Sequence, residues 1–245
     1  MSYKNFLFVF ITVLLSFQAF AREYSPGVDR DYPKKLLWGD THLHSNESAD
    51  AYTIGNSNLT PSDAFRFARG EEVISEKGVR AKLRVPLDFL LVSDHATFLG
   101  MFKRIEERDP KILKTPLGKR WRKYMDDDDP TLFTEFVDGL NGNLDETFSK
   151  EDYEPIWKEI TENVDKFNEP GIFTAFIGYE WTPAPTGDNL HRVVVFKDDA
   201  KLAQKIIPFS AIDSNKPEDL WNFLKDYNSA TGGEAISISH NSNIS

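Results

Sequence analysis

The sequence of 245 residues contains no cysteine. This absence excludes disulfide bonds, catalysis by a thiolate, and zinc sites built on cysteine sulfur. An excess of positive charge is also missing, because 29 basic residues face 39 acidic ones and give a formal charge of -10. Such a chain repels polyanions on average, so nucleic-acid binding is disfavoured. An acidic excess near histidines attracts divalent cations instead.

Long apolar runs are missing too, except at the N-terminus. Residues 6–17 are almost wholly apolar, Lys4 precedes them, and Ala-Phe-Ala follows at 19–21. This order is typical of a secretory signal peptide. A membrane anchor is the alternative, but the run is shorter than the ~20 residues that a spanning helix needs. We predict a signal peptide over residues 1–21 and an exported mature protein, periplasmic or extracellular, with no membrane partner after cleavage.

The first half of the mature chain has a strand–helix–strand order. Apolar runs within residues 36–44 and 82–92 predict two strands. Between them, Thr60 is followed by a proline and then by Asp63, the pattern of a capped helix start. This helix is expected to run to Arg69. The order favours a parallel sheet and an α/β fold.

A charged segment over residues 99–168 interrupts this pattern, with helical stretches around 101–108 and 151–168. We interpret it as an insertion over the mouth of the domain. Its four aspartates at 126–129 either bind a cation or form a solvated loop. Beyond the insertion, the sequence predicts strands at 172–179, 191–196 and 235–239 and a helix at 217–227.

The C-terminus follows closely on the last predicted strand, because Ser245 is five residues after His240. A barrel strand at this position would lack its following helix. We therefore expect residues 22–245 to be one domain that is truncated at its C-terminus. The alternative is an open sheet that is complete as it stands.

All five histidines lie where predicted strands begin or end. His42, His44, His95 and His240 follow apolar runs, whereas His191 opens one. Neutral imidazole is the commonest metal ligand in proteins. Strand ends at one rim of an α/β barrel are where active sites are built. The pattern predicts a metal-dependent enzyme.

Acidic residues accompany these histidines. Side chains alternate along a strand, so Asp40 shares one face with His42 and His44. Glu180 directly follows an apolar run, where a buried unpaired carboxylate is expensive, so it is a ligand or the partner of an arginine. Asp94 is a ligand, an acceptor that orients an imidazole N–H, or a helix N-cap.

Together these motifs resemble the PHP (polymerase and histidinol phosphatase) superfamily, and most closely a large, often secreted branch carried as a domain of unknown function. The matching segments are WGDTHLHS, PLDFLLVSDHA, GYEWT, DNLHRVVVF and SHNSN, in the family order. The resemblance covers residues 36–245. It implies a distorted (β/α)7 barrel, incomplete at the C-terminus here and carrying a helical insertion. It also implies two or three divalent metal ions at the carboxyl rim of the strands.

The resemblance further implies a role for each candidate residue. The implied ligands are His42, His44 and Glu180 for a first metal, Glu180, His191 and His240 for a second, and His95 with Asp50 or its competitor Glu47 for a third. Glu180 would bridge two ions, and the candidate catalytic residues are Glu180 and Asp94. The family's late Asp-x-His has no counterpart after His240.

A metal-dependent hydrolase, phosphoesterase-like, is therefore the expected function, with Mn, Zn or Fe as the ion and a small anionic substrate. Bound divalent ions lower the pKa of water to about 7, so metal-activated water can attack the ester without a nucleophilic side chain. Arg192 either holds the anionic substrate or faces outward. Trp181 either lines the pocket or packs under the insertion.

Two alternatives stay open. The amidohydrolase superfamily also begins with His-x-His, but the Ser93-Asp94-His95 segment has no place in its pattern. A protein of a different class, which is exported and binds metal without catalysis, would close the metal shell with protein ligands. An inactive fragment of a longer enzyme also belongs to this non-catalytic alternative.

Overall fold

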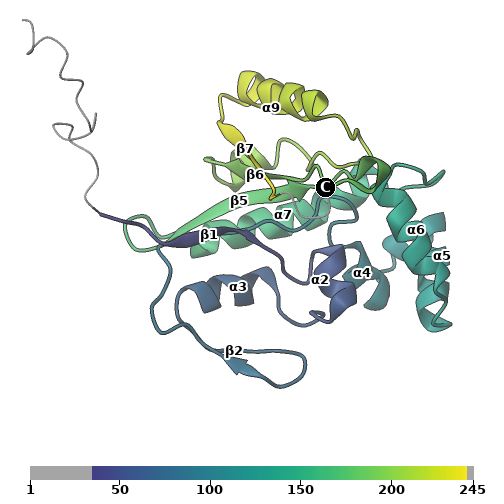
Figure 1. The fold of residues 1–245 in the computed structure, drawn as a ribbon, viewed down its shortest axis with the longest axis horizontal. Helices are drawn as coiled ribbons and strands as arrows, with labels where there is room; N and C mark the ends of the chain where they lie inside the picture. Colours follow the sequence, from purple (N-terminus) through teal and green to yellow (C-terminus); the bar gives the residue numbers. More distant parts are fainter. Residues whose placement is uncertain (1–34, 242–245) are drawn as a thin grey trace, which may run out of the picture. The chain divides into compact units, whose positions relative to one another are not determined.

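A curled five-stranded sheet is the frame of the fold (Figure 1). The computed structural model describes residues 35–241, so the predicted signal peptide lies outside the described residues. The unit discussed below starts at Leu37. Along the sheet the strands are β1 (Gly39–Leu43), β4 (Phe89–Val92), β5 (Thr174–Trp181), β6 (Arg192–Phe196) and β7 (Ala235–Ser239). The result is a mixed α/β fold whose sheet has the form of a half-barrel.

The parallel pairing predicted for the first half of the chain is confirmed, but the sheet as a whole is only partly parallel. Strands β1, β4 and β5 are parallel neighbours. Strand β6 is antiparallel to both β5 and β7. The physical reason is the short connection over residues 182–191, because a parallel crossover needs a dozen or more residues. The direction of β6 decides where His191 lies.

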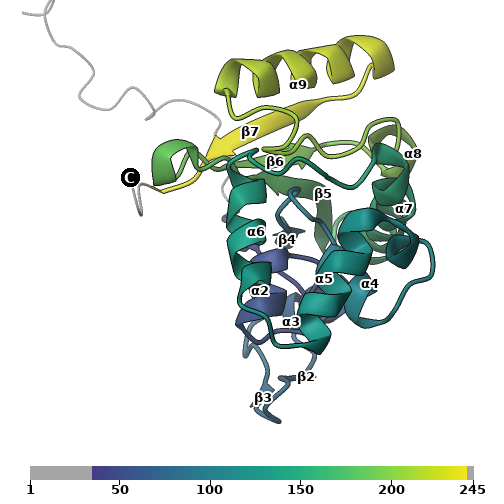
Figure 2. The ribbon, with the colours of Figure 1, turned by 90° about the vertical axis from the view of Figure 1, so that its right-hand side faces the viewer.

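Three helices pack directly against the sheet. They are α3 (Pro61–Ala68) on β4, α7 (Lys150–Phe167) on β5 and α9 (Pro217–Thr231) on β7 (Figure 2). Ile177 and Val194 belong to the large core that these helices share. Leu91, Val193 and Val195 form a small separate cluster. The two clusters follow from the alternation of side chains along each strand.

The predicted start of α3 is confirmed. The backbone N–H of Asp63 donates to Thr60 Oγ1, and the N–H of Thr60 donates to Asp63 Oδ2 at 2.9 Å. Pro61 occupies the first helical position, where its missing N–H is harmless. Phe65 is fully buried and joins this helix to the core. The helix ends at Ala68, one residue before the expected end.

The remaining elements show where the predictions were wrong. The strand expected over 82–92 begins only at Phe89, because Pro86 has no N–H to donate to a sheet. Of the insertion, α4 (Met101–Glu106) and α7 were expected, but two helices were not. The elements without a prediction are α2 (Ala49–Ile54), β2 (Val73–Ile74), β3 (Arg80–Ala81), α5 (Pro116–Asp126), α6 (Thr131–Leu140), α8 (Ala200–Ala203) and the short 3-10 turns η1 (Ile112–Lys114) and η2 (Pro185–Gly187).

The aspartate run of the insertion is engaged in ion pairs. Asp126 ends α5 and pairs with Arg108 and Arg122, and Asp127 pairs with Lys123. Within residues 35–241, no group of histidine and acidic residues that could hold a metal ion includes this run. The described helices also include none long and apolar enough to cross a membrane.

Candidate metal centre

The sheet brings all five histidines to one edge. His42 is on β1, His44 follows it, and His95 and His240 follow β4 and β7. His191 precedes β6, but because β6 is antiparallel, its amino end lies beside the carboxyl ends of its neighbours. The N–H of His240 donates to the carbonyl of His191 at 3.1 Å. The reversed strand therefore brings His191 into the same cluster.

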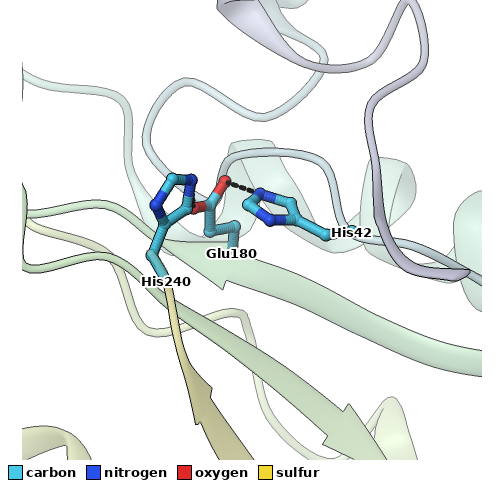
Figure 3. Close-up of side chains that lie close together, drawn as sticks. All are labelled: His42, Glu180 and His240. Atoms are coloured by element: carbon cyan, nitrogen blue, oxygen red, sulfur yellow. Dashed lines mark ion pairs between the residues drawn. The ribbon is translucent and has the colours of Figure 1, made fainter. Parts of the chain in front are cut away.

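One carboxylate lies at the centre of these imidazoles. Glu180, near the end of β5, has a ring nitrogen of every histidine no farther than 3.9 Å from one of its oxygens. Figure 3 shows His42 and His240 approaching it from two different strands. The distances to Oε2 are 3.3 Å from His42 Nε2, 3.1 Å from His44 Nε2 and 3.0 Å from His95 Nδ1, and those to Oε1 are 3.1 Å from His191 Nδ1 and 3.9 Å from His240 Nε2.

The state of Glu180 fits a bound cation. The residue is fully buried. Its Oε1 pairs with His191, but Oε2 has no hydrogen-bond partner among the described residues, although three ring nitrogens lie within 3.3 Å of it. A buried carboxylate oxygen without a donor is expensive. Ring nitrogens that approach it without donating leave their lone pairs available to a shared divalent ion.

The candidate ligands form three overlapping groups of ligand atoms, each within 4.8 Å. The groups are His42, Glu180 and His240; His44, Asp50 and His95; and His95, Glu180 and His191. The seven predicted ligands are all included, but the grouping differs from the implied one. His42 and His44 fall in separate groups, and His95 as well as Glu180 belongs to two. Strand spacing places side chains on a face and does not fix which ions they share.

Asp50, and not Glu47, lies among the imidazoles. Asp50 Oδ2 is 3.4 Å from His95 Nε2. Glu47 is buried and accepts from Lys103 at 2.6 Å and from Arg104 at 2.5 Å. The short helix α2 was not expected, and it carries Asp50 in its first turn. Glu47 already has two basic partners, so Asp50 is the better candidate ligand of the two acids.

Asp94 has a different position from those expected of it. Its two oxygens accept from the N–H of Ser45 at 2.5 Å and from Ser45 Oγ at 2.7 Å. It belongs to none of the three ligand groups, and α4 begins after Gly100, so Asp94 is no helix cap. Burial raises its pKa to about 6. Through its hydrogen bonds with Ser45, Asp94 links the segment after β4 to the segment after β1.

The electrostatics of the metal-free centre favour positive charge. Burial opposes protonation of His95, but the adjacent carboxylates of Asp50 and Glu180 outweigh it and raise its pKa to about 9. Burial alone would raise the pKa of Glu180, yet the surrounding imidazoles hold it far below its usual range. Burial lowers the pKa of His191. A divalent ion would supply the positive charge that a proton on His95 supplies without it.

Two buried hydroxyls beside the imidazoles were missed by the sequence reasoning. Ser48 Oγ lies 2.9 Å from His44 Nδ1. Thr182 Oγ1 lies 2.6 Å from His95 Nδ1 and donates to the carbonyl of Glu180 at 3.0 Å. Hydroxyl residues are common near strand ends, so only their contacts distinguish them. Such outer contacts orient metal-binding imidazoles.

Arg192 and Trp181 lie away from the cluster. Arg192 Nη1 donates to the backbone carbonyls of Leu190 and His191. Trp181 is fully buried, and its ring N–H donates to the carbonyl of Ser214 at 3.1 Å. Trp181 therefore packs in the core. The side chain of Arg192 is held at the backbone before β6.

The fold and this cluster define a mixed α/β protein with a candidate metal centre at one edge of its sheet. The chain belongs to the family described as "Protein of unknown function (DUF3604)", which matches residues 31–245. Comparisons with curated proteins and with solved structures found no match.

Proposed function

We propose that this protein is a metal-dependent hydrolase that uses metal-activated water to cleave phosphoesters. One observation carries the proposal. Five imidazoles from four segments surround one fully buried carboxylate that, within residues 35–241, has no lysine or arginine as a partner. A structural ion pair does not require so many neutral ligands. Overlapping ligand groups favour two or three ions close together.

The ligand set indicates the kind of ion. It consists of imidazole nitrogens and carboxylate oxygens, which suit Mn, Zn or Fe. Divalent ions at such a site lower the pKa of bound water to about 7 and polarise the bond under attack. Glu180 belongs to two ligand groups, so its two carboxylate oxygens would help to hold the ions of both, whereas the neutral imidazole of His95 offers one lone pair and would hold one ion.

The protein's own residues would hold and orient this centre. Glu180 is fixed by its burial and by the backbone bond in which the N–H of Ala96 donates to its carbonyl at 2.8 Å. Asp50 and His42 are more exposed than Glu180, so the cluster is accessible to solvent at these two residues. A small anionic substrate would enter there, in an exported protein that does not act on nucleic acid.

The PHP-like interpretation is preferred over the amidohydrolase one. Its distinguishing segment is Ser93-Asp94-His95. His95 lies 3.0 Å from Glu180 and 3.4 Å from Asp50, so this segment contributes to the cluster. The half-barrel sheet supports a distorted (β/α)7 barrel as the parent architecture, although β6 departs from it.

Hydrolysis of generic phosphomonoesters and phosphodiesters tests the proposal. Turnover should depend on added Mn, Zn or Fe, disappear with a chelator, and fall by several orders of magnitude in His191→Ala. Asp127→Asn is the control, since it removes an acidic residue that is already paired with a lysine. Metal binding without turnover of any ester or amide would point to the non-catalytic alternative.

A further inference from the structure

We propose that Ser48 is a positioning residue of the metal centre: its hydroxyl fixes the ring orientation and tautomer of His44 and aims Asp50 at the ion shared with His95. This inference rests on the proposed metal centre. Ser48 connects the members of one ligand group, His44, Asp50 and His95. The sequence analysis assigned it no role.

Ser48 stands where a helix cap is expected but does not act as one. It precedes α2 with an extended backbone, and serine at this position normally accepts from an N–H of the first turn. Here its side chain makes no capping hydrogen bond. The residue is fully buried. A buried hydroxyl that makes no capping hydrogen bond needs other hydrogen-bond partners.

Its three contacts use the full bonding capacity of a hydroxyl. A serine hydroxyl has one proton to donate and two lone pairs. Ser48 Oγ donates to Asp50 Oδ1 at 2.6 Å, because a carboxylate can only accept. It accepts from the backbone N–H of His95 at 3.2 Å. One lone pair remains, and it faces His44 Nδ1 at 2.9 Å.

This saturation assigns the tautomer of His44. Because the proton of Ser48 goes to Asp50, His44 Nδ1 must donate, and the neutral ring therefore carries its proton there. The lone pair is left on Nε2, which lies 3.1 Å from Glu180 Oε2 on the side of the cluster. With Oδ1 of Asp50 held by Ser48, Oδ2 is directed at His95.

Ser93 provides a matched control. It is also fully buried and follows β4 beside the centre, but its Oγ has no hydrogen-bond partner among the described residues. Ser48→Ala and Ser93→Ala thus remove the same atom, one with three partners and one without. Loss of an outer contact to a metal ligand typically weakens metal binding by about 10–100-fold.

The test titrates metal-free protein with zinc or manganese and counts ions and affinities. Ser48→Ala should bind one ion about 10–100-fold more weakly than wild type, with the other ions and the fold retained, and Ser93→Ala should match wild type. Unchanged affinities in Ser48→Ala, or loss of every ion, would overturn the positioning role. A wild type that binds no ion would instead refute the proposed function.

Imidazole nitrogen NMR gives a readout that needs no metal. In metal-free protein, at a pH where His44 is neutral, wild type should show the proton of His44 on Nδ1. Ser48→Ala should show a mixture of the two tautomers, and Ser93→Ala should keep the wild-type form. A His44 ring protonated on Nε2 in wild type would contradict the assignment.

Discussion

Two acidic regions of this protein have opposite surroundings. At the edge of the sheet, Glu180 is fully buried, and all its ion-pair partners among residues 35–241 are imidazoles. In the insertion, Asp126 and Asp127 are exposed and pair with arginine and lysine. The count of acidic residues would favour the aspartate run as a cation site. Burial without a basic partner is the better criterion, because it leaves a negative charge for an ion to compensate.

The largest effect is expected from Glu180→Gln. Glutamine keeps the shape but replaces the charge at the centre of two ligand groups. We expect the variant to lose nearly all bound metal, as measured by elemental analysis of the folded protein. Glu234→Gln, at an exposed surface pair with Lys197, is the control. Full metal content in Glu180→Gln would show that the buried carboxylate is no more important for metal binding than the exposed aspartates of the insertion.

A pH-dependent loss of stability is expected for the metal-free protein. Because the folded-state pKa of His95 is raised from 6.5 to about 9, its contribution is fully present below about pH 6.5 and is lost as the pH rises through 9. The loss is at most on the order of 3 kcal/mol in the free energy of unfolding. Denaturant unfolding with a chelator, across this pH range, measures it. A His95→Gln variant should show a flatter dependence; an equally steep one would assign the effect elsewhere.

An intermediate effect is expected at Asp94, a buried carboxylate whose partner is a serine. Asp94→Ala leaves the N–H and hydroxyl of Ser45 without acceptors. The expected cost is about 1–3 kcal/mol of unfolding free energy. At saturating metal the variant should bind the same number of ions as wild type. A lost ion in the folded variant would show that Asp94 is a ligand after all.

The smallest effect is expected in the aspartate run. Asp127→Asn breaks an exposed pair with Lys123. Exposed pairs contribute little to stability. Neither the metal content nor the midpoint of thermal unfolding should change measurably. A lower metal content would mean that the run binds a cation in addition to the cluster.

The sequence predicts which residues form the centre better than it predicts how they are arranged. His42, His44, His95 and Glu180 could be selected because each is local to a strand end. The reversal of β6 was readable in principle, since His191 opens its strand where the others end theirs, and the preceding connection is short. The partition into ligand groups depends on distances across strands, which no local pattern contains.

The helices that were not predicted were missed for different reasons. Helix α2 has only six residues, too few to show a helical period, although Ser48 at its start is a residue type suited to a cap. Helix α5 does have the usual start signal, because Thr115 precedes a proline and caps the N–H of Gly118. The contacts of Ser48 arise only when the segments after β1 and β4 meet.

Metal content of the purified protein tests the central claim most directly. Elemental analysis should be made on wild type and on His42→Ala/His44→Ala side by side, after both are shown to be folded. We predict near-stoichiometric Mn, Zn or Fe in wild type, with most of it lost in the double variant. Equal metal content in the two proteins, or none in a well-folded wild type, would contradict a metal centre built on Glu180 and these imidazoles.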